Sequence, residues 1–80
     1  MRLSVDHSDP GLDAWLEHRD RGIVVKVDGV VVLLPITADE EAGYVLAHEA
    51  DADGNPILDR AKAETRKVEL RGAVTIEFLR

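Results

Sequence analysis

The clearest pattern in the chain is a pair of aliphatic runs on either side of Asp28-Gly29, in the stretch VKVDGVVVLL. Asp-Gly between two β-branched runs favours a type I′ turn, because that turn needs positive φ at both central residues. We therefore predict antiparallel strands over residues 23–27 and 30–34. Pro35 has no N–H for a strand ladder and is expected to end the second of these strands.

Further strands are predicted where apolar and polar residues alternate, at residues 2–6, 44–50, 65–70 and 73–79. The stretch DADGNP, residues 51–56, is a dense turn signal. The last two strands flank Arg71-Gly72 and are expected to form a second hairpin. The side chains expected to point inward are Val68, Leu70, Val74, Ile76 and Phe78. Those expected to point outward are Lys67, Glu69, Thr75 and Glu77.

One helix is predicted in HSDPGLDAWLEHRDRG. Ser8 or Asp9 is expected to cap it, Pro10 to occupy its first position and Gly22 to end it. A single apolar stripe at helical spacing is formed by Leu12, Trp15 and Leu16. Because so short a helix is marginal alone, we predict that it docks this stripe on the sheet with Trp15 buried.

Two segments allow alternatives. In TADEEAG, Thr37 and Glu40 have capping-box spacing, so this segment is either one helical turn or an acidic loop. Residues 60–64 are polar and either irregular or frayed helix. Residues 1–80 together predict a single α+β domain, a small and mostly antiparallel β-sheet with about five or six strands, two hairpins and one short N-terminal helix. The pattern leaves open whether the sheet closes into a barrel.

The size and composition of the chain point to self-association. Its 80 residues contain no Cys, which excludes disulfides and thiolate metal sites. Residues 30–34 are apolar on both faces, and one short helix can cover only one face of the sheet. We predict a homo-oligomer, most simply a dimer, with Val31 and Leu33 at its interface.

The charge distribution suggests a second kind of contact. The net charge is −6, which argues against direct binding to nucleic acid. Residues 27–59 contain acids but no Lys or Arg, whereas residues 60–80 are rich in bases. These are either solvated faces or complementary interaction surfaces. In the second interpretation, the residues predicted to contact a protein partner are Asp39, Glu40, Glu41, Tyr44, Asp51 and Asp53.

Catalytic and metal-binding patterns are weak. DADGN begins like a calcium loop, but Gly54 falls at the fourth position, Pro56 at the sixth, and Lys62 where the bidentate Glu should be. No two of the three histidines, His7, His18 and His48, have the local spacing of a metal site. The contiguous acids at 39–41 do not suggest separate acid and base roles, and no glycine-rich phosphate loop occurs. We predict no catalytic residue, no cofactor and no metal, and therefore a protein that is not an enzyme.

No apolar run approaches the roughly 20 residues of a membrane span, so we expect no membrane association. We expect a soluble, intracellular protein.

Four stretches carry a resemblance: VDGVVV, TADEEAGYV, DADGNPILD and ELRGAVTIEF. Their layout resembles a recurring type of small protein encoded in tailed bacteriophage and prophage genomes. The resemblance implies a viral accessory or assembly role, located in the cytoplasm of a bacterial host or in a virion, and it brings no catalytic residues with it. Here the strand at 30–34 is unusually apolar. The leading hypothesis is a non-enzymatic accessory protein that binds a protein partner, such as host machinery, through its acidic turn region. The alternatives are a self-associating assembly module of a phage particle and, third, a small enzyme.

Overall fold

The hairpin at Asp28-Gly29 forms as predicted. Strands β2 (Ile23–Val27) and β3 (Val30–Val32) are antiparallel, with Val27 opposite Val30. The two loop residues have φ of 52° and 82°, the positive values that a type I′ turn requires. Strand β3 ends before Leu33, and Pro35 opens the next strand, β4 (Pro35–Asp39). The first residue of a strand is a position that tolerates proline.

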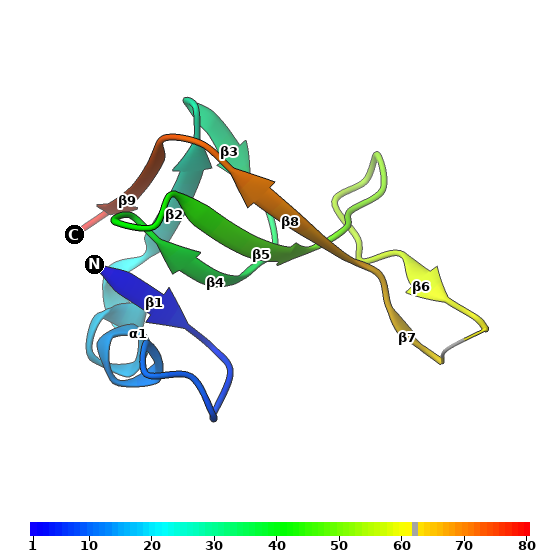
Figure 1. The fold of residues 1–80 in the computed structure, drawn as a ribbon, viewed down its shortest axis with the longest axis horizontal. Helices are drawn as coiled ribbons and strands as arrows, with labels where there is room; N and C mark the ends of the chain where they lie inside the picture. Colours follow the sequence, from blue (N-terminus) through cyan, green and yellow to red (C-terminus); the bar gives the residue numbers. More distant parts are fainter. Residues whose placement is uncertain (62) are drawn as a thin grey trace.

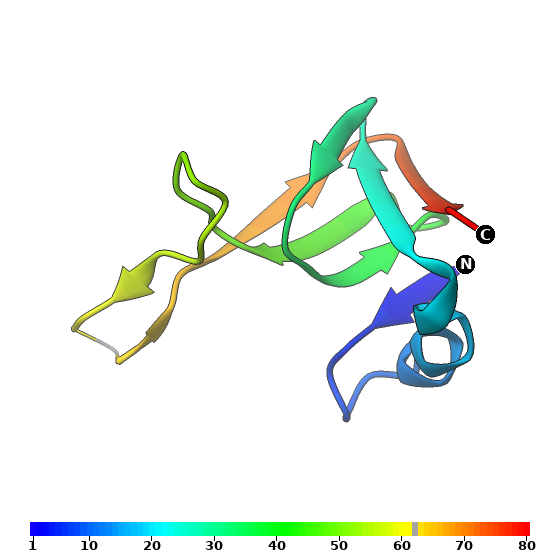
Figure 2. The same ribbon diagram turned by 180° about the vertical axis from the view of Figure 1, so that it is seen from behind.

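The computed structural model describes residues 1–61 and 63–80, and over these residues it contains nine strands in three sheets (Figures 1 and 2). The largest sheet has the antiparallel order β1-β4-β5-β8. Strand β4 lies between β1 (Arg2–Ser4) and β5 (Tyr44–His48), and β8 (Lys67–Arg71) lies on the other side of β5. The fold fits a general α+β description. The prediction of five or six strands in two hairpins is wrong.

Thr37 lies inside β4, so the alternative of a helical turn at TADEEAG is also wrong. Its side chain is buried, and its Oγ1 lies 2.8 Å from the Oγ of Ser4 on β1. The acidic residues that follow form the turn at 40–43 between β4 and β5. The hydroxyl pair therefore satisfies two buried polar groups where the sequence suggested a helix cap.

The second sheet has the order β3-β2-β9, where β9 (Val74–Phe78) pairs along its whole length with β2. Strands β8 and β9 therefore do not form the predicted hairpin. At Gly72 the chain leaves one sheet and enters the other. The segment at 33–34 makes a similar passage from β3 to β4, so the two sheets are joined at two corners (Figure 1).

A third, two-stranded sheet projects from the body (Figures 1 and 2). It consists of β6 (Leu58–Asp59) and β7 (Glu64–Thr65), which extend beyond the ends of β5 and β8. We call residues 49–61 and 63–66 the arm. The turn predicted at DADGNP lies at its base, where Asp51 Oδ1 accepts hydrogen bonds from the N–H groups of Asp53 and Asn55. Residues 60–64, expected to be irregular or frayed helix, include the start of β7, and residue 62 lies outside the described residues.

The two larger sheets enclose a small aliphatic core. Its buried members are Val25, Ala38, Val45, Ala47 and Val74. Outside this core, the helix α1 (Leu12–His18) packs against β1 and continues as the 3₁₀ turn η1 (Arg19–Arg21) (Figure 2). The helix begins later than expected, after Gly11, where a Cβ would lie 3.0 Å from the backbone of Leu3. Glycine therefore permits the close approach of helix and strand.

The helix docks less deeply than predicted. Trp15 is only half-buried, and Leu16 is 43 % exposed. The expectation that Trp15 is buried between helix and sheet is therefore met only in part.

Candidate functional site

An apolar groove of about 410 Å³ lies between the β2–β3 hairpin and the sheet formed by β5 and β8. The apolar side chains that line it are Val27, Val30, Val31, Val32, Leu33, Ala47, Val68 and Leu70. It is larger than the hollow of about 110 Å³ beside Trp15 and the hollow of about 300 Å³ between β6 and β7, and its wall is predominantly apolar. We call this hollow the apolar groove.

The exposed wall of the groove is β3 and the residue after it. Val30 is 69 % exposed, Val31 50 % and Leu33 62 %. In the register of the hairpin, Val32 lies opposite buried Val25, so only this end of β3 packs on the core. The rest of the strand overhangs the groove. The predicted interface residues Val31 and Leu33 are thus both at the surface, on one continuous apolar segment.

The polar residues at the rim are already bound within the chain. His48 Nδ1 lies 2.9 Å from Thr65 Oγ1, and the carboxylate of Glu49 forms an ion pair with Arg66, 3.2 Å from its Nε. The guanidinium of Arg71 lies over the ring of Tyr44, 5.1 Å from its centre. Because these polar groups are engaged, the groove presents an apolar floor with a satisfied polar rim.

The contact between His48 and Thr65 is the arrangement closest to a nucleophile with its base. Such a pair also needs a third group that orients the imidazole. Within residues 1–61 and 63–80, the other ring nitrogen of His48 has no hydrogen-bond partner. The contact ties the arm to β5, and that structural role accounts for it.

The three histidines do not converge. The ring of His18 packs on that of Phe78, 4.7 Å between centres, whereas His48 lies at the groove. In the part of the chain that the structure describes, no three side chains of His, Asp or Glu are placed to hold a metal ion.

The acidic residues predicted to contact a partner fall into two places. Asp39, Glu40 and Glu41 lie with Tyr44 at the beginning of β5, whereas Asp51 and Asp53 lie beyond its other end, in the arm (Figure 1). The length of β5 therefore separates residues that the sequence suggested as a single surface.

Several of these acids serve the fold. Asp39 Oδ1 accepts hydrogen bonds from the N–H groups of Ala42 and Glu41, and its Oδ2 accepts one from Arg2. The pKa of Asp39 is lowered, first by the bond from Ala42 and then by the bond from Arg2. Glu40 Oε2 accepts a hydrogen bond from Ile76 N–H at 3.2 Å, and its Oε1 lies 3.4 Å from the N-terminal amine.

The two acids most available to a partner are Glu41 and Asp53. The side chain of Glu41 is 90 % exposed, and Asp53 lies exposed at the tip of its turn. They occupy the two separate places described above.

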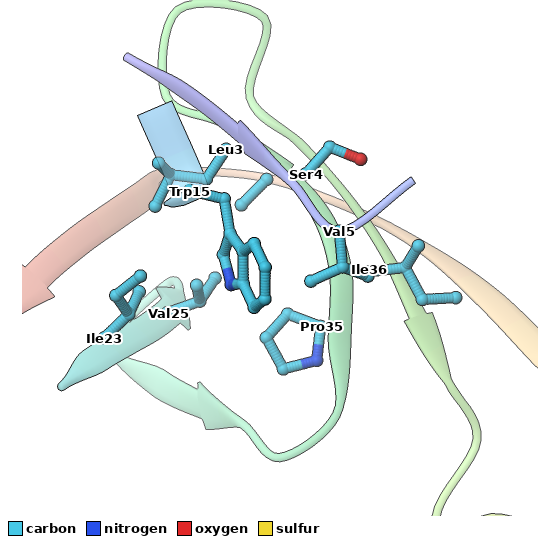
Figure 3. Close-up of a pocket in the computed structure, with 9 residues that line it drawn as sticks. Leu3, Ser4, Val5, Trp15, Ile23, Val25, Pro35 and Ile36 are labelled. Atoms are coloured by element: carbon cyan, nitrogen blue, oxygen red, sulfur yellow. The ribbon is translucent and has the colours of Figure 1, made fainter. Parts of the chain in front are cut away.

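A second hollow, of about 110 Å³, lies beside Trp15 (Figure 3). The indole ring points into it between Val25 on β2 and Pro35 on β4, with Val5 on the far side. Incomplete docking of the helix leaves this space.

The sequence predicts Val31 and Leu33, on one wall of the groove, as interface residues, and it does not predict the other wall. The alternation at Val68 and Leu70 is the signal for that wall, but it predicts a hairpin with residues 73–79. The actual partner of β8 is β5, which places Val68 and Leu70 across from β3.

Among the described residues, no helix has the length and apolar character needed to span a membrane. Comparisons of the chain with protein-family models, with curated proteins and with solved structures find no match in any of the three.

Proposed function

We propose that the protein is a non-enzymatic interaction module that binds another protein chain through the apolar groove. The observation that carries this proposal is the exposure of Val30, Val31 and Leu33, at 69 %, 50 % and 62 %, along one side of the groove. Contiguous apolar surface of this kind marks interaction sites on small proteins. A protein interface also combines an apolar centre with a polar rim, as this groove does.

The resemblance to small phage-encoded proteins supports an accessory or assembly role. Such a role requires binding and no chemistry, which agrees with a groove whose polar rim groups are engaged within the chain. The proposal therefore places the protein in a bacterial host or in a virion, where a protein chain is its ligand.

Affinity capture with three baits tests the proposal. Wild-type protein is compared with Leu33→Asp, which places a charge at the groove, and with Leu79→Asp, which makes the same change at a residue 73 % exposed on the last strand's extension. A partner that binds the groove is retained by wild type and Leu79→Asp and lost with Leu33→Asp. Calorimetry with the purified partner should then show at least about a tenfold loss of affinity, which corresponds to about 1.4 kcal/mol.

Equal capture by the three folded baits would show that the groove is not the contact surface. Circular dichroism of each bait establishes that it is folded.

A second proposal keeps the acidic turn at 40–43 as the contact. The 90 % exposure of the Glu41 side chain favours it, because an exposed carboxylate on a chain of net charge −6 attracts basic surfaces. Binding of this kind weakens steeply with salt and weakens further in Glu41→Gln. Binding through the groove is insensitive to both changes, so one salt titration separates the two proposals.

A further inference from the structure

In the described part of the chain, strand β3 lies at the end of its sheet, and backbone N–H and C=O groups line its outer edge. Within residues 1–61 and 63–80 the strand pairs only with β2, and Val31 lies opposite Lys26. A two-residue hairpin loop is closed by a hydrogen-bonded pair, here Val27 and Val30, so the next residue belongs to a non-hydrogen-bonded pair. The N–H and C=O of Val31 therefore point away from β2.

The other outer edges of the two larger sheets are protected. On β1, the N–H of Ser4 donates to the carbonyl oxygen of Gly11 at 3.1 Å, so the segment before the helix covers this edge. On β9, the carboxylate of Glu40 caps the N–H of Ile76. Strand β8 alternates charged with apolar residues, KVELR, which is a common way to keep an edge in solvent.

Strand β3 has none of these protections. From Val30 to Leu34 the sequence is VVVLL, with no charge and no proline, and Val30, Val31 and Leu33 are exposed. An exposed, apolar strand edge is a template for pairing with another strand. The ligand expected at this edge is therefore an extended strand.

We infer that this strand is β3 of a second copy, paired antiparallel about a twofold axis at Val31. The inference rests on the proposed function, since it assigns the chain that binds the same apolar surface. The two Val31 residues then exchange both backbone hydrogen bonds, and Val30 of one protomer lies opposite the partner's Val32. Each three-stranded sheet continues into its copy.

The hairpin has no free charge, and this favours an uncharged partner strand such as β3 of a second copy. The nearest charges on the hairpin are already bound: Lys26 is paired with Glu77 at 3.1 Å, and Asp28 accepts from the backbone of Ala73. A charged residue on an incoming strand would lose water and gain no counter-charge, which is costly. A second β3 brings only β-branched and aliphatic side chains, which form favourable cross-strand pairs. Twofold self-pairing also leaves no β3 edge open, so assembly stops at the dimer.

The experiment measures molar mass by light scattering at about 100 µM, at low and at high salt, for wild type and for Val31→Pro. Within a protomer the N–H of Val31 makes no ladder bond, so proline at this edge position removes no bond of the monomer. We expect wild type to have twice the mass of the chain at both salt concentrations. We expect Val31→Pro to have the mass of one chain with an unchanged circular dichroism spectrum.

Two further samples keep the test decisive. Val31→Lys charges the edge without restricting the backbone, and it should also have the mass of one chain. It replaces Val31→Pro as the test if the proline variant does not fold. Glu69→Gln makes the same change in charge on the β8 edge and should leave the dimer intact. Hydrogen exchange of wild type supplies a measurement without mutation. The Val31 amide should exchange at least about tenfold more slowly at high protein concentration than at low, because pairing protects it.

A folded Val31→Pro or Val31→Lys that remains dimeric would overturn the inference, as would a Val31 amide whose exchange is independent of concentration. Dissociation by Leu58→Asp together with an intact dimer in the Val31 variants would assign the contact to the arm, where Leu58 is 58 % exposed. A monomeric wild type also overturns the inference. In that case the proposed function stands or falls on the separate capture experiment with Leu33→Asp.

Discussion

Asp28 and Ala73 exchange two hydrogen bonds across 45 residues of sequence. The N–H of Asp28 donates to the carbonyl oxygen of Ala73 at 2.9 Å, and the N–H of Ala73 donates to Asp28 Oδ1 at 2.8 Å. The aspartate that adopts positive φ in the β2–β3 turn therefore also fixes the corner at which β8 passes into β9. The overhanging hairpin and the wall of the groove that faces it are held together by this contact.

We expect Asp28→Ala to lower the free energy of unfolding by about 1 to 2 kcal/mol, because it removes one hydrogen bond and places Ala at positive φ. Asp28→Asn should lose much less, since the amide oxygen still accepts and Asn tolerates this conformation. Urea unfolding of both variants measures the difference. Asp53→Ala, at an exposed turn position, is the control and should change stability by less than about 0.5 kcal/mol. Equal losses in the Ala and Asn variants would contradict a role for the accepting oxygen.

Gly43 and Gly29 both have positive φ, of 64° and 82°, but their surroundings differ. A Cβ at Gly43 would lie 2.7 Å from the carbonyl oxygen of Gly72, whereas a Cβ at Gly29 would have no neighbour within 4 Å. We expect Gly29→Ala to cost about 1 kcal/mol from backbone strain alone, and Gly43→Ala about 2 to 4 kcal/mol because the backbone must also shift. Urea unfolding of the two variants side by side checks this. Similar losses would mean that the approach of Gly43 to Gly72 adds nothing.

Local patterns predicted the elements of this fold better than their partners. The turn at Asp28-Gly29 has a local cause, the φ values of the two residues, and it formed as predicted. The four residues expected to point outward from the last two strands are all exposed, namely Lys67, Glu69, Thr75 and Glu77. Alternation identifies the faces of a strand but not the strand beside it.

The choice of partner for β9 depends on contacts that are distant in sequence. Arg71-Gly72 resembles a hairpin loop, but a Cβ at Gly72 would lie 2.5 Å from the carboxylate of Asp28. That packing directs β9 to β2 and leaves β8 with β5. The pattern of residues 65–79 alone cannot predict this pairing, because Asp28 lies outside that segment.

The candidate site shows the same division. Hydrophobicity alone identified the exposed residues Val31 and Leu33, since an apolar run on both faces of a strand exceeds what one short helix can cover. The acids are predicted as one surface because they are near in sequence. In the structure the length of β5 separates them. Asp39 and Asp51 also accept hydrogen bonds within turns, and the composition of the chain does not predict the geometry of those turns.

Stability should decline in acid because of the carboxylates around Arg2. Its guanidinium donates to both oxygens of Asp9, at 2.9 and 2.6 Å, and to Asp39 at 3.2 Å. The bond from Arg2, followed by the N–H of Gly11, lowers the pKa of Asp9 from 3.8 to about 2. The pKa of Asp39 is lowered too, and that of Asp6 is lowered by the N–H and hydroxyl of Ser8.

Because the pKa of Asp9 in the folded protein lies below its unfolded value, its contribution is complete above about pH 4 and is lost as the pH falls toward about 2. We expect the urea midpoint to fall over this interval and to fall less steeply in Asp9→Asn. Asp13→Asn, at an exposed helix position, should keep the wild-type slope. An unchanged slope in Asp9→Asn would show that the pairing with Arg2 does not contribute.

Trp15 should behave as a half-buried residue in both spectroscopy and stability. Its indole lies in the hollow between Val25 and Pro35, and about 110 Å³ beside it is unfilled (Figure 3). The guanidinium of Arg19 lies over the indole, 5.9 Å from the ring centre. Trp15→Ala should therefore cost about 2 to 3 kcal/mol, less than the roughly 3 to 5 kcal/mol of a fully buried aromatic residue. As the chain has a single tryptophan, its emission reports this site alone, and iodide should quench it more than a buried indole and less than the unfolded chain. A blue emission that iodide does not quench, together with a loss above about 4 kcal/mol, would mean that the helix closes over the hollow in solution and that the ring is core.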